Sequence, residues 1–100
     1  MRFTKQEFDT MIHERFDTLY VILEKELTHT IRSWCAVDPA LNGRACEGDI
    51  FSDTCVKVIK YCVTGFFLRE GRTEPNTDPD SFCKWIYTVA RNVKRDYSNS

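Results

Sequence analysis

Basic, hydroxyl and amide side chains recur at helical spacing near the end of the chain. The set comprises Lys84, Tyr87, Thr88, Arg91, Asn92, Lys94 and Arg95. Lys84, Thr88, Arg91 and Arg95 share one face of a helix, because they follow one another at intervals of three or four residues. Such a face suits the phosphates and bases of a nucleic acid. An ordinary solvated charged face has the same composition, so the pattern by itself leaves both interpretations open.

The segment that must position these side chains begins like a helix. Asp78 is an N-cap candidate, and Pro79 fits the first helical position, where its missing N–H costs nothing. Asp80 places a negative charge near the positive end of the helix dipole. An apolar stripe then runs along the opposite face through Phe82, Trp85, Ile86, Val89, Ala90, Val93 and Tyr97. The sequence therefore predicts an amphipathic helix over 79–97.

This helix closely resembles a known motif. The run S-F-C-K-W-I-Y-T-V-A-R-N-V-K-R-D-Y, from Ser81 to Tyr97, is similar to the end of region 2 of bacterial sigma factors of the sigma-70 family. It is most similar to the extracytoplasmic-function (ECF) group. The matching positions are Ser81, Phe82, Trp85, Ile86, Val89, Ala90, Arg91, Asn92, Asp96 and Tyr97. The resemblance fixes residue identities and not only polarity.

A second segment supports the resemblance. Gly48 to Val58, G-D-I-F-S-D-T-C-V-K-V, is similar to the part of region 2 that contacts RNA polymerase in the family. The resemblance implies that Asp49, Ser52, Asp53 and Ile59 meet the clamp helices of the polymerase. Ser52 stands where the family has its main glutamine contact. Read without the resemblance, these residues are simply the acidic start of a helix.

The resemblance implies a domain of a sigma factor that binds core RNA polymerase and recognises and melts the promoter −10 element. The partners would be the polymerase and the non-template DNA strand, and the family also allows an anti-sigma factor. Thr88, Arg91 and Asn92 occupy positions that face promoter DNA in the family. Tyr87, Lys84, Lys94 and Arg95 are added from the helix face alone. The alternative is a helical protein-binding regulator without promoter recognition, whose apolar segment near 49–68 is its interface.

The composition predicts one folded all-α domain. The chain has 100 residues, of which 42% are hydrophobic, with four Gly and three Pro. We expect a compact bundle of three main helices at about 5–35, 49–68 and 79–97, with loops at 36–48 and 69–77. Thr4 and Glu7 form a capping-box pattern at the start of the first helix. A strand is conceivable at 56–63, but length and the resemblance favour a helix. The single domain spans 1–100 and has no region 4.

The charge is distributed unevenly. Residues 1–80 hold ten basic and fourteen acidic residues, a net charge of −4, whereas residues 81–100 hold four basic and one acidic, a net charge of +3. This asymmetry favours an anionic partner for the C-terminal helix only.

Several functional classes are disfavoured. The five cysteines lack a C-x-x-C pair and lie far from His13 and His29, so we expect buried free thiols and no metal. No set of nucleophile, base and acid and no phosphate-binding Gly loop is present, so we expect neither an enzyme nor a cofactor. No apolar run suits a membrane span or signal peptide, which predicts a soluble cytoplasmic protein without membrane contact.

Overall fold

The protein is an all-α bundle, as the sequence predicts. A computed structural model describes residues 1–14, 18–39, 41, 47–61, 66 and 78–99. Within these residues the chain forms helices α1 (Lys5–His13), α2 (Leu19–Val37), α3 (Glu47–Tyr61) and α4 (Pro79–Ser98), and no strand. The ribbon measures 43 × 27 × 19 Å along its principal axes.

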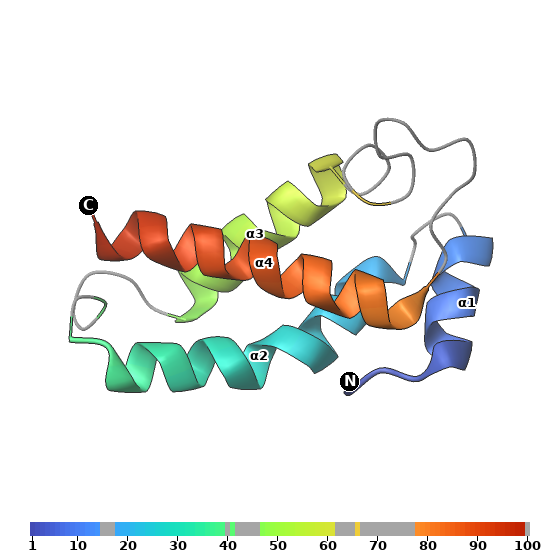
Figure 1. Cartoon of the computed structure of the whole chain (residues 1–100), viewed down its shortest axis with the longest axis horizontal. Coiled ribbons are helices and arrows are strands. Elements are labelled where there is room, and N and C mark those ends of the chain that lie inside the picture. The colour runs from blue at the N-terminus through green and yellow to red at the C-terminus, as the bar shows by residue number, and fades with distance from the viewer. Residues whose placement is uncertain (15–17, 40, 42–46, 62–65, 67–77, 100) are drawn as a thin grey trace.

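Three of the helices lie side by side (Figure 1). α2 and α4 run in the same direction, and α3 packs against both in the opposite direction. The much shorter α1 lies across one end of this bundle, close to the starts of α2 and α4. The C-terminus of α4 and the end of α2 lie at the other end of the bundle.

The N-terminal segment forms two helices instead of the single helix expected over 5–35. The Thr4–Glu7 capping box is present, and α1 ends at His13 with Glu14 as its C-cap. α2 then starts after Thr18, whose carbonyl accepts from the N–H groups of Val21 and Ile22 at 3.1 and 3.3 Å. A continuous helix of this length would span about 46 Å. That length exceeds the longest axis of the domain, 43 Å. A single helix over 5–35 would therefore carry Phe8 and Met11 away from the core.

The other boundaries are close to the predicted ones. α4 matches the expected 79–97 almost residue for residue. α3 begins two residues earlier than expected, at Glu47, and α2 continues to Val37, so the predicted loop over 36–48 is shorter at both ends. α3 continues to Tyr61, so the alternative of a strand over 56–63 is wrong for residues 56–61. The predicted end of the second helix near 68 and the loop over 69–77 lie outside the described residues.

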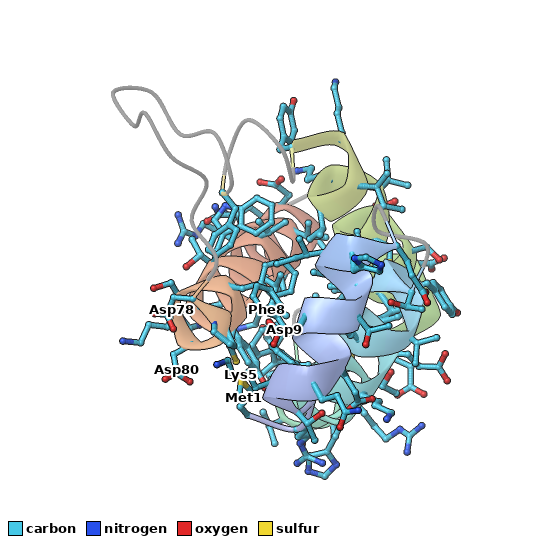
Figure 2. The ribbon with its side chains drawn as sticks, turned by 90° about the vertical axis from the view of Figure 1, so that its right-hand side faces the viewer. Met1, Lys5, Phe8, Asp9, Asp78 and Asp80 are labelled. Atoms are coloured by element: carbon cyan, nitrogen blue, oxygen red, sulfur yellow. The ribbon has the colours of Figure 1, made fainter. Side chains whose placement is uncertain are left out.

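The core is built mainly from one stripe of each helix. Phe8 and Met11 come from α1, and the buried face of α4 supplies Phe82, Ile86, Ala90 and Val93. The N-terminal end of the core is aromatic: the rings of Phe3, Phe8 and Phe66 lie 6.0, 5.2 and 5.2 Å from that of Phe82. Figure 2 shows Phe8 directed from α1 into the bundle, with Asp78 and Asp80 on the outer side of α4. This end of the core therefore joins α1 to α4.

Candidate nucleic-acid and polymerase interfaces

The start of α4 is capped as predicted. Asp78 accepts the backbone N–H of Asp80 at 3.3 Å and the hydroxyl of Ser81 at 2.7 Å. The Ser81 hydroxyl bond is the main reason that the pKa of Asp78 lies below its ordinary value. Pro79 occupies the first turn. The cap sets where the helix begins, and therefore the register of every side chain that follows.

Burial of the apolar stripe directs the opposite face of α4 to solvent. Phe82, Ile86 and Ala90 are fully buried and Val93 is 2% exposed. The exposed residues on the other side include five of the seven predicted nucleic-acid contacts: Lys84, Thr88, Arg91, Asn92 and Arg95. Hereafter these five residues are called the α4 outer row. The Thr88 hydroxyl donates to the Lys84 carbonyl at 3.0 Å, so its oxygen still has a lone pair available to accept.

The cations of the α4 outer row are not neutralised by the described part of the protein. Among the described residues, no carboxylate oxygen lies within 4.0 Å of the side-chain nitrogens of Lys84, Arg91 or Arg95. Three positive charges that have no carboxylate within 4.0 Å among the described residues thus follow one face over about three turns of helix. Such a row attracts an extended polyanion, because each phosphate contact releases bound counterions.

The other two predicted contacts, Tyr87 and Lys94, lie toward α2 and not on the α4 outer row. The Tyr87 hydroxyl lies 3.0 Å from the carbonyl oxygen of Glu26, to which it donates, and 3.3 Å from the Thr30 hydroxyl. Lys94 lies 3.9 Å from the Asp38 carboxylate, and its ammonium is 5.7 Å from the centre of the Trp34 ring. Both residues therefore hold α4 against α2.

Glu26, for which no role was predicted, lies at the centre of this contact. Its side chain is 2% exposed, and its carboxylate accepts from the Arg2 backbone N–H and from the Cys83 thiol at 3.2 Å. The single proton of the Tyr87 hydroxyl is shared between this carboxylate, at 3.1 Å, and the Glu26 carbonyl oxygen. Burial by itself raises the pKa of Glu26, but these donors and the N-terminal ammonium lower it below its ordinary value. An acid between Leu23 and Leu27 on an apolar face was the available sequence signal.

The predicted polymerase contacts lie on the outward side of α3. Asp49, Ser52, Asp53 and Ile59 are all exposed, and Ile59 keeps 60% of its surface open to solvent. Val56, 63% exposed, lies among them. This set of five residues is called the α3 outer face. It combines two carboxylates with two aliphatic side chains that keep most of their surface in water.

One residue of the α3 outer face also has a structural contact. Asp53 accepts a hydrogen bond from the Tyr97 hydroxyl, and the nearby Lys57 lies 3.6 Å from Asp96. These two contacts join α3 to α4. Replacing Asp53 would therefore disturb the packing of α4 as well as the surface, whereas Ser52 and Ile59 offer cleaner positions for substitution.

Trp85, at the edge of the aromatic end of the core, is half-buried. Its ring centre lies 5.8 Å from that of Phe66 and 6.1 Å from that of Phe82. Packing is thus its main role in the isolated domain, as the apolar stripe indicates. Asn92 follows two turns later on the same side of α4 and is exposed.

Cys55 and Cys83 are free thiols. Cys55 is buried, and Cys35 and Cys83 are half-buried, whereas Cys46 and Cys62 lie outside the described residues. Burial raises the pKa of Cys55 to about 11 and that of Cys83 to about 12, in the second case with help from the adjacent Glu26 carboxylate. Thiols with such pKa values are weak nucleophiles at neutral pH.

The described part of the chain was also searched for metal-binding groups and for helices that could span a membrane. It contains no group of three or more His, Cys, Asp or Glu side chains that could hold a metal ion. None of its helices is long and apolar enough to cross a membrane. No protein-family model, no curated protein and no solved structure matches the chain.

Proposed function

We propose that this chain is a sigma factor domain of the region 2 type, which binds core RNA polymerase and engages the −10 promoter element as single-stranded DNA. The observation that carries the proposal is the division of the Ser81–Tyr97 motif. Phe82, Ile86 and Ala90 are buried, whereas Arg91 and Asn92 are exposed. The residues that resemble a family motif thus divide into a packing set and an accessible polar set.

The α4 outer row supports a DNA contact of two kinds. Lys84, Arg91 and Arg95 supply charge for phosphates without a competing carboxylate from the described residues. The Asn92 amide supplies both a donor and an acceptor for the edge of an unpaired base. Exposed bases of a melted strand are accessible to such groups, whereas bases inside a duplex are not.

The α3 outer face supports the polymerase contact. Val56 and Ile59 leave about 60% of their surfaces in water, and three polar residues surround them. A protein partner would cover these aliphatic groups and stabilise the complex by roughly 25 cal/mol per Å² of apolar surface removed from water. The same exposure also favours the alternative, a helical regulator that binds a protein and no promoter, so DNA binding is the deciding property.

The DNA test uses fluorescent single strands carrying a −10 sequence and a scrambled one, titrated at two salt concentrations with core polymerase present. The double variant Arg91→Ala/Arg95→Ala should weaken binding of both strands equally. Its plot of log affinity against log salt should become less steep by about 0.7 for each lost phosphate contact. Asn92→Ala should instead reduce the preference between the strands by about 1–3 kcal/mol.

The matched control is Arg2→Ala/Lys5→Ala, which removes two exposed basic side chains at the N-terminal end of the domain. It changes the net charge by the same amount and should leave affinity nearly unchanged. Melting temperatures of all variants exclude unfolding as the cause. If neither strand binds at low salt, or if the control weakens binding as much as the double variant, the promoter role is refuted.

The polymerase test compares two substitutions of exposed aliphatic residues. Ile59→Lys lies on the α3 outer face, and Val37→Lys lies at the end of α2, where Val37 is 78% exposed. Ile59→Lys should reduce co-purification with core polymerase, and Val37→Lys should not. Equal recovery of polymerase with both variants would contradict this assignment of the interface.

A further inference from the structure

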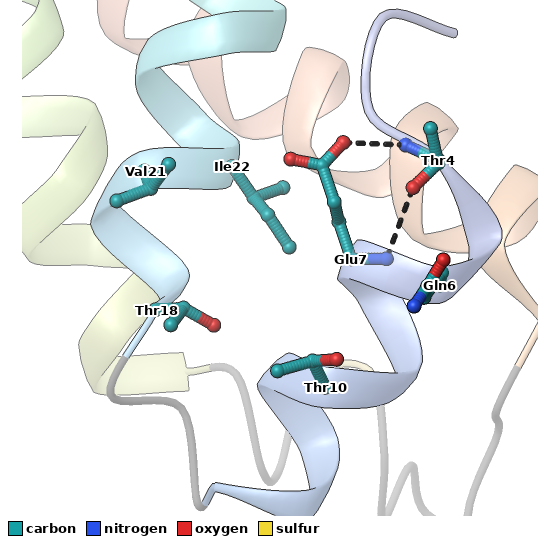
Figure 3. Close-up of a pocket in the computed structure, with 7 residues that line it drawn as sticks. All are labelled: Thr4, Gln6, Glu7, Thr10, Thr18, Val21 and Ile22. Atoms are coloured by element: carbon teal, nitrogen blue, oxygen red, sulfur yellow. Dashed lines mark hydrogen bonds between the residues drawn. The ribbon is translucent and has the colours of Figure 1, made fainter.

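The start of α1 and the end of α4 are held by different kinds of contact. At the start of α1, the side chains of Thr4 and Glu7 each accept the backbone N–H of the other residue, so the contact is local (Figure 3). α4 ends at Ser98, and its last buried side chain is Val93, which is 2% exposed. Residues 94–98, which follow Val93, form the last turn of α4. Because helix ends fray, this turn depends on contacts with the neighbouring helices.

The last turn of α4 is joined to α3 on one side and to the end of α2 on the other. On the α3 side, the Tyr97 hydroxyl donates to the Asp53 carboxylate. A second contact on this side joins Asp96 and Lys57 at 3.6 Å. These two side chains are 73% and 45% exposed, and a pair of such exposed groups contributes little stability in water. On the α2 side, the contact is made through Asp38.

Tyr97 makes the contact that combines packing with a hydrogen bond. It is the only aromatic or aliphatic side chain among residues 94–98, and it is half-buried with its ring against the core. Its hydroxyl donates to a charged carboxylate, that of Asp53, and hydrogen bonds to charged acceptors are stronger than those between neutral groups. Tyr97 therefore fixes the turn both toward the core and toward α3.

Arg95 lies on the outer side of the same turn. It is exposed and belongs to the α4 outer row, and its backbone carbonyl accepts the N–H of Asn99 at 3.0 Å. If the turn unwinds, helical geometry no longer directs Arg95 to the side that carries Arg91. A frayed turn must also be ordered again when Arg95 binds a phosphate, which weakens that contact. The order of the last turn thus determines how well Arg95 serves the row.

We infer that Tyr97 is a positioning residue of the DNA interface: its hydroxyl bond to Asp53 keeps the last turn of α4 helical and Arg95 in line with the α4 outer row. This role rests on the proposed DNA contact of that row. Tyr97 acts from the inner side of the helix and through Arg95, without contacting the strand itself. Its hydroxyl thereby links a residue of the α3 outer face to the DNA-binding side of α4.

The first measurement is the affinity for the fluorescent −10 and scrambled strands at a saturating concentration of core polymerase. Tyr97→Phe removes the hydroxyl and keeps the ring in the core. It should weaken binding of both strands by about two- to fivefold, because it removes one hydrogen bond that orders the turn. The matched control is Tyr20→Phe, which makes the same change at an exposed position on α2 and should leave both affinities nearly unchanged.

A double-mutant cycle shows whether the effect passes through Arg95. In the Arg95→Ala background, Tyr97→Phe should weaken binding no further, because the side chain that Tyr97 positions is gone. A general loss of structure or a weaker polymerase contact would lower the affinity equally in both backgrounds, and that result overturns the inference. An unchanged affinity of Tyr97→Phe, or an equal loss in Tyr20→Phe, overturns it as well.

Amide hydrogen exchange of the full chain tests the order of the turn without DNA. In Tyr97→Phe the amides of residues 97–99 should exchange about twofold faster or more, whereas those of Ile86 and Ala90, in the buried part of α4, should not change. Unchanged exchange at 97–99 overturns the inference even where DNA affinity falls. If neither strand binds the wild type, the proposed function is refuted, and the exchange rates alone decide whether Tyr97 orders the turn.

Discussion

Replacement of Glu26 by glutamine tests how α4 is held on the bundle. One oxygen of the Glu26 carboxylate accepts from Cys83 and Tyr87, and the other accepts from the Arg2 backbone N–H. In Glu26→Gln the amide oxygen can keep the first pair of bonds as neutral bonds. The amide nitrogen then faces the Arg2 N–H, so two donors oppose each other and that bond is lost.

The expected loss follows from these three bonds. A hydrogen bond to a charged group contributes about 1.5–3 kcal/mol, and a neutral one about 0.5–1.5 kcal/mol. Losing one charged bond and weakening two others costs roughly 3–5 kcal/mol, and relief from burying a charge offsets part of this. We expect a net destabilisation of about 2–3 kcal/mol. With an m-value near 1–3 kcal/mol per M, the urea midpoint should fall by about 0.7–3 M.

The effect should depend on pH in a defined direction. The folded-state pKa of Glu26 is lowered from an ordinary value of 4.5, so the carboxylate contributes its stability above that value. This contribution is lost as the pH falls through the folded-state pKa. The difference in unfolding free energy between the wild type and Glu26→Gln should therefore be full near pH 7 and should shrink below about pH 4.5.

Urea unfolding followed by circular dichroism measures both quantities. Glu24→Gln, an exposed position on the same helix, is the matched control and should change stability by less than about 0.5 kcal/mol. Equal midpoints for Glu26→Gln and the wild type at neutral pH would refute this account. So would a difference that stays constant down to about pH 3, because a buried carboxylate with a lowered pKa must lose its contribution on protonation.

Three further predictions concern the core, the Thr18 hydroxyl and the thiols. Phe82→Ala removes the ring at the centre of the aromatic cluster and should cost about 3–5 kcal/mol in urea unfolding, whereas Val56→Ala should cost far less because Val56 is 63% exposed. Thr18→Val should raise the unfolding free energy by about 1 kcal/mol, since it removes a buried unpaired hydroxyl; a lower melting temperature would contradict this. Cys83, with a pKa of about 12, should react with iodoacetamide at pH 8 about tenfold or more slowly in the folded chain than in urea, as measured by mass spectrometry of its peptide.

Much of α4 could be predicted because its signals are local. Asp78 and Pro79 fix the start of the helix, and Phe82, Ile86 and Val93 recur at a helical period. Local geometry therefore determines which side chains point away from the stripe, and Lys84, Arg91 and Arg95 lie in solvent as expected. The same reasoning explains why the Thr4–Glu7 capping box was correct.

The surroundings of residues at the edge of the polar face of α4 could not be predicted in the same way. Tyr87 and Lys94 lie about a quarter turn from the centre of the α4 outer row, where the helical period alone leaves a side chain at a boundary. Whether such a residue meets water or protein depends on where the next helix lies. α2 lies on that side and supplies Glu26, Thr30 and Asp38, so both side chains are drawn into the interface.

What the sequence determined by itself is the all-α class, the two ends of α4 and the separation of its apolar stripe from its polar face. These properties depend on the period of one helix and on hydrogen bonds between residues close in the chain. Only the tertiary structure decided that the N-terminal segment forms two helices, that Glu26 accepts from both Cys83 and Tyr87, and that Thr18 has an unpaired hydroxyl. Those outcomes depend on distances between side chains on different helices, and no periodicity within one helix encodes such distances.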